Sequence, residues 1–169
     1  RSAASASSNR RTSRAQIEAV LGRLRERVPA ITIRTTFITG FPGETEGQFA
    51  ELLDFVRTWR LDAVGVFAYS PEPGTPAARL GPAVPADERQ RRAEAILAAQ
   101  QEIAHAAAAA RVGQEMDVLV DGADADGRCV GRHAGQAPDI DGVCHLRRPA
   151  EPGTFVRARA VAADGYDLI

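Results

Sequence analysis

The chain is poor in cysteine, the residue that forms disulfides in small folds and often binds metals. It has two cysteines among 169 residues, Cys129 and Cys144. They are too few for a disulfide framework and lack the spacing of a metal site. Each lies among apolar neighbours, so we expect both to be buried structural thiols. Such usage excludes a disulfide-rich secreted fold and is typical of a reducing, cytoplasmic setting.

Lysine, aromatic residues and long apolar runs are also absent or scarce. All 21 basic side chains are arginine, and aromatic residues make up 5%. No apolar run approaches the roughly 20 residues of a membrane span, so no membrane association is expected. The start of the chain is rich in serine, alanine and arginine but has no apolar core, so we do not expect these residues to be a secretory signal. We expect residues 1–12 to be a disordered start.

Charge is unevenly distributed in an otherwise ordinary globular composition of 44% hydrophobic and 25% charged residues. Residues 1–111 contain 15 arginines against 12 acidic residues, whereas residues 112–169 contain 6 arginines against 10 acidic residues. The C-terminal third is therefore acidic, which bears on its partner.

The first two thirds of the chain have the pattern of an α/β unit. Ser13 with Gln16, and Thr45 with Gln48, form capping-box pairs that begin two helices. Apolar spacing predicts helices over about 14–27, 45–60 and 87–111, a buried strand over 31–39 and a second strand over 63–69. Strand, helix and strand in this order indicate a right-handed parallel βαβ unit. Residues 71–85 carry five prolines, so we expect an extended loop.

After Gly113 the pattern changes to short strands separated by turns. Five are expected, over about 115–120, 127–132, 142–146, 154–161 and 166–169. Five short strands in so small a space indicate a closed or nearly closed barrel. We place the domain boundary near Val112.

The segment from Arg34 to Thr45 carries the most information about function. A β-branched run ends in Gly40-Phe41-Pro42-Gly43, and a helix begins at Thr45. Ligands of α/β proteins lie at such turns, outside the carboxyl ends of the strands. Glycine lets the backbone approach a ligand closely, and a helix N-terminus offers free N–H groups. An ordinary strand-to-helix turn is the alternative.

A second loop, Tyr69-Ser70-Pro71-Glu72-Pro73-Gly74-Thr75-Pro76-Ala77, follows the next apolar run. Together the two loops resemble the end of the radical S-adenosylmethionine (SAM) domain of the methylthiotransferases. That family has a Gly-Phe-Pro-Gly-Glu-Thr turn and a Tyr-Ser-Pro-x-x-Gly-Thr-Pro-Ala loop in this order. The resemblance covers nearly all of the chain from about Ser13 onward.

The tail resembles the TRAM domain, the small β-barrel that ends methylthiotransferases. Its segments 137–142 and 165–168 are similar to the RimO subgroup, which attaches a methylthio group to the β-carbon of an aspartate in a small-subunit ribosomal protein. The subgroup that modifies tRNA adenosines shares the first two motifs. The resemblance implies an α/β fold: a partial radical SAM (TIM-like) barrel over 13–111, then an OB-like TRAM barrel over 112–169.

The resemblance also implies cofactors. In the family a 4Fe–4S cluster, held by C-x-x-x-C-x-x-C, cleaves SAM to a 5′-deoxyadenosyl radical, and a second cluster on a separate domain supplies sulfur. This chain has neither set of cysteines. We therefore expect no metal ligands in it, and we predict that it cannot reduce SAM by itself.

The motif match assigns positions around the SAM cavity and no catalytic acid or base. Arg34 could instead form an ion pair with a barrel carboxylate, and Glu44 could only complement a helix N-terminus. The expected SAM-binding or cavity residues are Arg34, Thr36, Ile38, Gly40, Phe41, Pro42, Gly43, Glu44, Tyr69 and Ser70.

The histidines and one pair of aspartates say less about function. His105, His133 and His145 have no ligand spacing, and we expect surface or partly buried roles for them. Asp139 and Asp141 lie on one loop, where a turn contact or an acidic rim is expected rather than a cation site.

The charge of the tail favours one partner over another. A surface that grips tRNA should be basic, so an acidic tail favours a basic ribosomal protein as the substrate. Solubility alone is the alternative reason for the charge. A tRNA methylthiotransferase and a cluster-free binding module for a ribosomal partner remain the other candidate functions, and we expect a monomer.

Overall fold

The computed structural model describes residues 12–169, which form two compact units: unit 1 reaches Gln101 and unit 2 begins at Glu102. The division falls within helix α4 (Ala86–Ala109). The predicted disordered start, apart from Thr12, lies outside the described residues. Each unit is described by itself.

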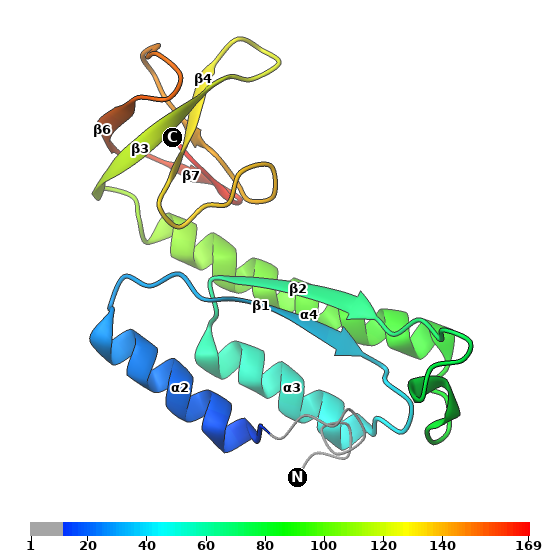
Figure 1. Cartoon of the computed structure of the whole chain (residues 1–169). Coiled ribbons are helices and arrows are strands. Elements are labelled where there is room, and N and C mark those ends of the chain that lie inside the picture. Colours follow the sequence, from blue (N-terminus) through cyan, green and yellow to red (C-terminus); the bar gives the residue numbers. More distant parts are fainter. Residues whose placement is uncertain (1–11) are drawn as a thin grey trace. The chain divides into compact units, whose positions relative to one another are not determined.

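Unit 1 alternates helices and strands as the apolar spacing predicts (Figure 1). Both capping boxes are present, with the hydroxyls of Ser13 and Thr45 accepting from the N–H groups of Gln16 and Gln48. A short 3₁₀ turn interrupts the proline-rich loop, which was expected to be extended throughout. The elements are α2 (Arg14–Arg27), β1 (Arg34–Thr39), α3 (Glu46–Trp59), β2 (Ala63–Ala68), η1 (Ala77–Arg79) and the first part of α4.

Strands β1 and β2 form a two-stranded parallel sheet that is buried on one face only. On the covered face, Phe37 packs edge-on against Phe55 of α3, with ring centroids 6.2 Å apart. Val56 of α3 and Ile96 of α4 are fully buried. The alternating burial of β1 shows that its other face is open. The prediction of a buried strand over 31–39 therefore holds for one face only, because nothing in the described chain covers the second face.

Unit 2 is a six-stranded sheet wrapped around a core of its own. The strand order is β6-β3-β4-β5-β8-β7. The core consists of Ala108 at the end of α4 and Val118, Cys144, Ala160 and Leu168. The strands are β3 (Glu115–Ala123), β4 (Cys129–His133), β5 (Cys144–His145), β6 (Phe155–Arg159), β7 (Ala163–Asp164) and β8 (Asp167–Leu168).

Several details of unit 2 differ from the sequence expectations. Six strands are present instead of five, because β7 and β8 form a minimal hairpin around Gly165, whose φ is +59°. Cys129 is only partly buried, while Cys144 is buried as expected. The Asp141 carboxylate accepts a hydrogen bond from the N–H of Ala137 at 2.6 Å, which is the expected turn contact.

No helix between residues 12 and 169 is long and apolar enough to cross a membrane.

Candidate functional site at the ends of β1 and β2

The open face of the sheet in unit 1 carries apolar side chains in water. We call it the exposed strand face and define it as Arg34, Thr36, Ile38, Gly65 and Phe67. Ile38 is 55% exposed and Phe67 is 65% exposed, and the two residues are partners in the parallel register. A contiguous apolar surface of this kind marks a place where something else binds or packs.

Gly65 leaves a low point in this face, because glycine has no side chain to cover the backbone there. It is the register partner of Thr36, and a Cβ atom at Gly65 would lie 3.3 Å from the hydroxyl oxygen of Thr36. A larger residue would therefore crowd Thr36 and raise the surface between Thr36 and Phe67.

β1 ends in a tight turn. The N–H of Glu44 donates to the carbonyl of Phe41 at 2.8 Å, with Pro42 and Gly43 at the two central positions. Gly43 has a φ of +80°. Proline followed by glycine with a positive φ is the pattern of a type II turn. The turn is also tied to the proline-rich loop, because the N–H of Gly43 donates to the carbonyl of Pro82 at 3.0 Å.

Gly40 is required where the strand enters this turn. Its φ is +71°, and a Cβ atom there would overlap the side chain of Arg89 on α4. The Gly40 N–H donates to the Glu44 carboxylate at 3.0 Å. Gly40, just before the turn, is therefore hydrogen-bonded to Glu44 and lies close against the side chain of Arg89.

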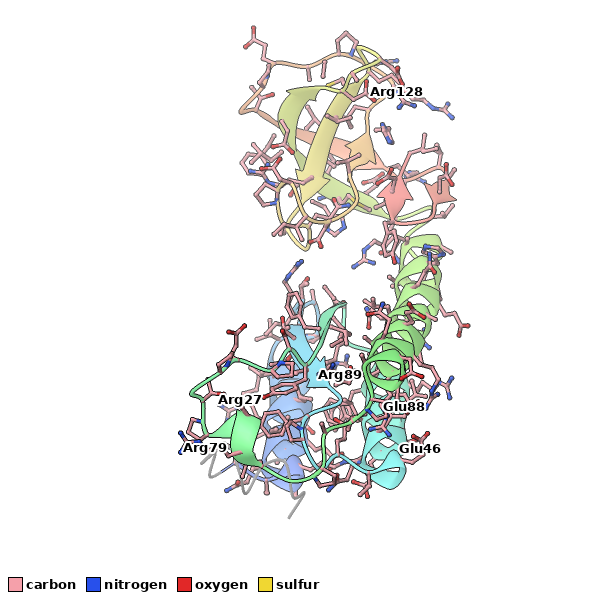
Figure 2. All side chains as sticks on the ribbon, turned by 90° about the vertical axis from the view of Figure 1, so that its right-hand side faces the viewer. Arg27, Glu46, Arg79, Glu88, Arg89 and Arg128 are labelled. Carbon is pink, nitrogen blue, oxygen red and sulfur yellow. The ribbon has the colours of Figure 1, made fainter. Side chains whose placement is uncertain are left out.

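Glu44 connects the turn to the start of α4 through Arg92. Their side chains are 8% and 6% exposed, and Arg92 Nη1 lies 2.6 Å from Glu44 Oε1. The same guanidinium contacts Glu88 at 2.7 Å and Glu46 at 3.0 Å, while Arg91 contacts Glu88 at 2.7 Å. Glu46 and Glu88 both lie beside the start of α4 in Figure 2. We call Glu44, Glu46, Glu88, Arg91 and Arg92 the turn network.

The pKa values of Glu88 and Arg92 shift in the directions that favour their charged forms. Hydrogen bonds from Arg91 and then Arg92 lower the pKa of Glu88 to about 2. Burial alone would lower the pKa of Arg92, but its hydrogen bonds to Glu44 and Glu88 outweigh burial and raise it. The turn is thus anchored to α4 by the buried ion pair of Glu44 and Arg92.

The second loop meets the first at the same sheet edge. The N–H of Tyr69 donates to the carbonyl of Thr39 at 2.9 Å, and its ring packs edge-on against Phe41 at 5.1 Å. The buried Tyr69 hydroxyl has no hydrogen-bond partner among the described residues. Since buried polar groups are nearly always paired, this hydroxyl is free to bind a group that fills the site.

The structure therefore places the ten residues assigned from the motifs as follows. Arg34, Thr36 and Ile38 lie on the exposed strand face, residues 40–44 form the turn beyond it, and Tyr69 packs on that turn. Ser70 follows Tyr69 and is exposed. The Glu44 carboxylate accepts a hydrogen bond from the N–H of Gly40 and forms an ion pair with Arg92.

Three residues of this region were missed from the sequence. Gly65 and Phe67 could have been found, because they alternate with Tyr69 along β2 and so share its face. Arg92 carries only a weak local signal, its spacing of four from Glu88, because its main partner lies 48 residues away in the sequence.

Comparison with known proteins covers both units. Residues 112–169 match the TRAM domain family. Over 147 residues, 86% of this chain, the sequence is 50% identical to a protein of Desulforudis audaxviator named ribosomal protein uS12 methylthiotransferase RimO. Proteins of the same name from Bordetella petrii and Desulfitobacterium hafniense are 49% and 43% identical, over 86% and 95% of the chain. The chain matches a C-terminal segment of the RimO family.

The matched part is only about a third of each RimO relative: 32%, 33% and 37% of the three proteins. It includes the two loops of unit 1 as well as the TRAM region. Within residues 12–169, no three His, Cys, Asp or Glu side chains are grouped so that they could hold a metal ion.

Proposed function

We propose that this chain forms part of a methylthiotransferase that adds a methylthio group to the β-carbon of an aspartate in a small-subunit ribosomal protein. The observation that carries the proposal is the match to RimO proteins across both units at 43–50% identity. In this proposal unit 1 supplies part of a radical SAM barrel and its SAM cavity, and unit 2 recognises the substrate in the cytoplasm.

The residues of unit 1 fit the adenosyl part of SAM. An adenine ring needs an apolar surface and nearby polar groups, and Ile38 and Phe67 offer such a surface in water. The low point at Gly65 leaves room beside Thr36. The unpaired Tyr69 hydroxyl supplies a polar group at the same sheet edge.

The same residues do not fit an iron–sulfur cluster. Such a cluster needs several cysteine thiolates, and both cysteines of this chain lie in unit 2. The chain therefore contributes no cluster ligand in this proposal. SAM and the clusters would supply the radical and sulfur chemistry, while these residues bind and orient SAM.

The turn network has a positioning role in this proposal. It holds Gly40 and the type II turn against α4, so the backbone beside the adenosyl group is rigid before SAM arrives. Preorganised contacts of this kind lower the ordering cost of binding.

The proposal is tested in a chimera that joins the remaining N-terminal part of the Desulforudis audaxviator relative to this chain. After cluster reconstitution, mass spectrometry should detect a methylthio group on the aspartate of a uS12 peptide. The chain alone should yield no 5′-deoxyadenosine. Modification of tRNA instead of the peptide would favour the rival enzyme, and the chain's own 5′-deoxyadenosine formation would contradict our reading of its cysteines.

A variant in the chimera tests the exposed strand face. Gly65→Val should lower SAM affinity in equilibrium dialysis by roughly tenfold or more, because it fills the space beside Thr36. Valine suits a strand, so folding should be preserved. Gly47→Ala on the exposed side of α3 is the control. Unchanged SAM binding by Gly65→Val would place the cofactor elsewhere.

A further inference from the structure

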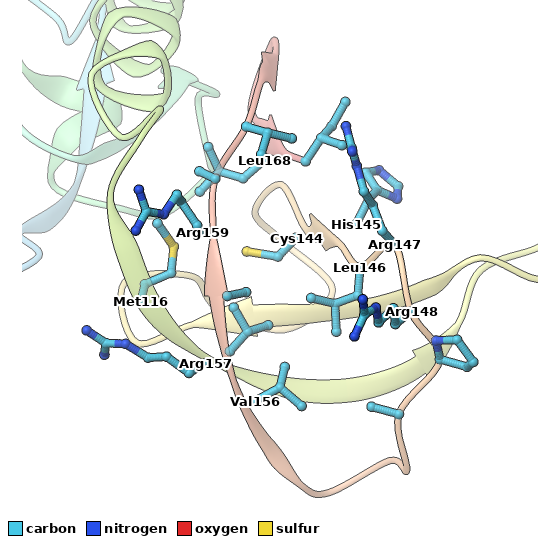
Figure 3. A pocket seen from close by; sticks show the side chains of 17 residues that line it. Met116, Cys144, His145, Leu146, Arg147, Arg148, Val156, Arg157, Arg159 and Leu168 are labelled. Carbon is cyan, nitrogen blue, oxygen red and sulfur yellow. The ribbon is translucent and has the colours of Figure 1, made fainter.

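Unit 2 contains an apolar groove that the proposed reaction does not use. Its volume is about 340 Å³, and it opens between β6 and the segment that follows β5. Leu146, Val156 and Leu168 point toward its middle in Figure 3. Val118, Cys144 and Leu168 belong to the core, so the groove reaches into the interior of the sheet.

Arginines line the margins of the groove although unit 2 is acidic. Four of the six arginines between residues 112 and 169 lie there, Arg157 and Arg159 on one side and Arg147 and Arg148 on the opposite side (Figure 3). The concentration of positive charge is thus local, against a surplus of acidic residues in the rest of the segment.

The two sides differ in how their charge is compensated. Arg159 lies 2.6 Å from Glu115, and Arg157 lies 3.1 Å from Asp117; each pair is also a register pair of β3 and β6. The exposed side chains of Arg147 and Arg148 have no ion-pair or hydrogen-bond partner in the described part of the chain. Uncompensated positive charge therefore lies beside the segment that follows β5.

The β6 side of the groove presents a free strand edge. β6 pairs with β3 on one side, and no other described strand pairs with it. Because hydrogen bonding alternates along an antiparallel strand, the backbone groups of every second residue of β6 point away from β3. An extended peptide can add to such an edge and place alternate side chains in a pocket.

We propose that this groove binds an extended acidic peptide segment, which pairs with the edge of β6, inserts one aliphatic side chain and places carboxylates beside Arg147 and Arg148. Charge complementarity selects the acidic character and the apolar walls select the aliphatic anchor. No Phe, Tyr or Trp side chain lines the groove, and His145 contributes its only aromatic ring. Single-stranded RNA, which relies on stacking against aromatic rings, fits it less well.

The site is distinct from the expected contact with a basic ribosomal substrate, because that contact rests on the acidic residues of the tail. The groove proposal therefore stands or falls independently of the proposed enzyme activity.

Fluorescence anisotropy with the full chain tests the proposal. The probe is a fluorescein-labelled peptide with one leucine between aspartates. Matched probes replace the leucine with serine or the aspartates with arginines, and a fourth probe is single-stranded oligouridylate. The acidic leucine peptide should bind most tightly, and the serine version should bind roughly tenfold more weakly because the anchor is lost.

Charge reversal provides the variants. Arg147→Glu with Arg148→Glu should weaken binding of the acidic leucine peptide by roughly tenfold or more. Arg23→Glu with Arg79→Glu changes net charge equally in unit 1, where both side chains are exposed and form no ion pair with another described residue, and it should leave binding unchanged. Thermal unfolding checks that both variants fold.

Three results would overturn the proposal. The first is equal binding of the acidic and arginine peptides, and the second is preferential binding of oligouridylate. The third is an equal loss of binding in the two double variants, which would mean that only net charge matters.

Discussion

Units 1 and 2 complete their sheets in different ways. The two strands of unit 1 have a helix-covered face and an open face where Ile38 and Phe67 are exposed, and neither strand has a second partner in the described chain. Unit 2 wraps six strands around its own core. A two-stranded sheet is marginal by itself, so the stability of unit 1 must come from its helices and the turn network.

The comparison teaches where each unit is vulnerable. Unit 1 should respond strongly to changes at the turn network and weakly to changes on its open face. Unit 2 should respond to any loss of its core, including the last residues of α4. Trp59 is the only tryptophan and lies in unit 1, so its fluorescence follows that unit alone.

The largest expected effect comes from Arg92→Ala. It leaves the Glu44 carboxylate buried without its cation, which should destabilise unit 1 by about 3 kcal/mol. Arg91→Ala is the matched control, since Arg91 contacts Glu46 and Glu88 but is 53% exposed, and it should cost about 1 kcal/mol or less. Urea unfolding followed by Trp59 fluorescence measures both; equal losses would mean that the buried pair has no special role.

A somewhat smaller effect is expected from Gly40→Ala. The substitution forces a positive φ on alanine and places its methyl group against Arg89, for a combined cost of about 2–3 kcal/mol. Gly43→Ala has the same backbone problem but no atom within 4 Å of the new methyl group, so about 1–2 kcal/mol is expected. If the two variants unfold at the same urea concentration, the contact with Arg89 does not limit the turn.

The next prediction concerns unit 2. A fragment of residues 102–169 should be more stable than one of residues 112–169 by about 2 kcal/mol, because the shorter one lacks core residue Ala108 and the contact of His105 with Tyr166. Circular dichroism during thermal unfolding compares them. Ala109→Ser in the longer fragment is the control, since Ala109 is exposed. Equal stability would show that the helical residues add nothing to the stability of unit 2.

The smallest effect should be the acid response of Glu88. Its pKa is about 2 in the folded chain against an ordinary 4.5, so the unfolded state binds its proton more readily. This contribution to stability is complete above the ordinary value and is lost as the pH falls from 4.5 toward about 2. In the Glu88→Gln variant, the unfolding midpoint of unit 1 should depend less on pH across this range than in the wild type. Parallel curves for both chains would contradict the assignment.

The sequence predicted local structure well where the signal was local. The capping boxes at Ser13 and Thr45 marked two helix starts, and the β-branched runs marked β1 and β2. The minimal strand β7 was missed because two residues carry no periodicity. The open face of β1 was missed because an apolar, β-branched run has the same composition whether one face or both are covered.

The candidate site was predictable in part. The order of the motifs identified the turn and Tyr69, since both follow directly on strands. The pairing of Glu44 with Arg92 was not predictable, because it joins residues far apart in the sequence through tertiary packing. Whether the ten assigned residues bind SAM stays a prediction.

Cys144 gives the groove of unit 2 a property of its own. Its Sγ lies 3.3 Å from the amide oxygen of Gln136, and burial raises the pKa of its thiol. A protonated thiol alkylates slowly, so the rate at which iodoacetamide modifies Cys144 reports how often the groove opens to its floor. Local opening of unit 2 can thus be timed by mass spectrometry at a cysteine that the chain already contains.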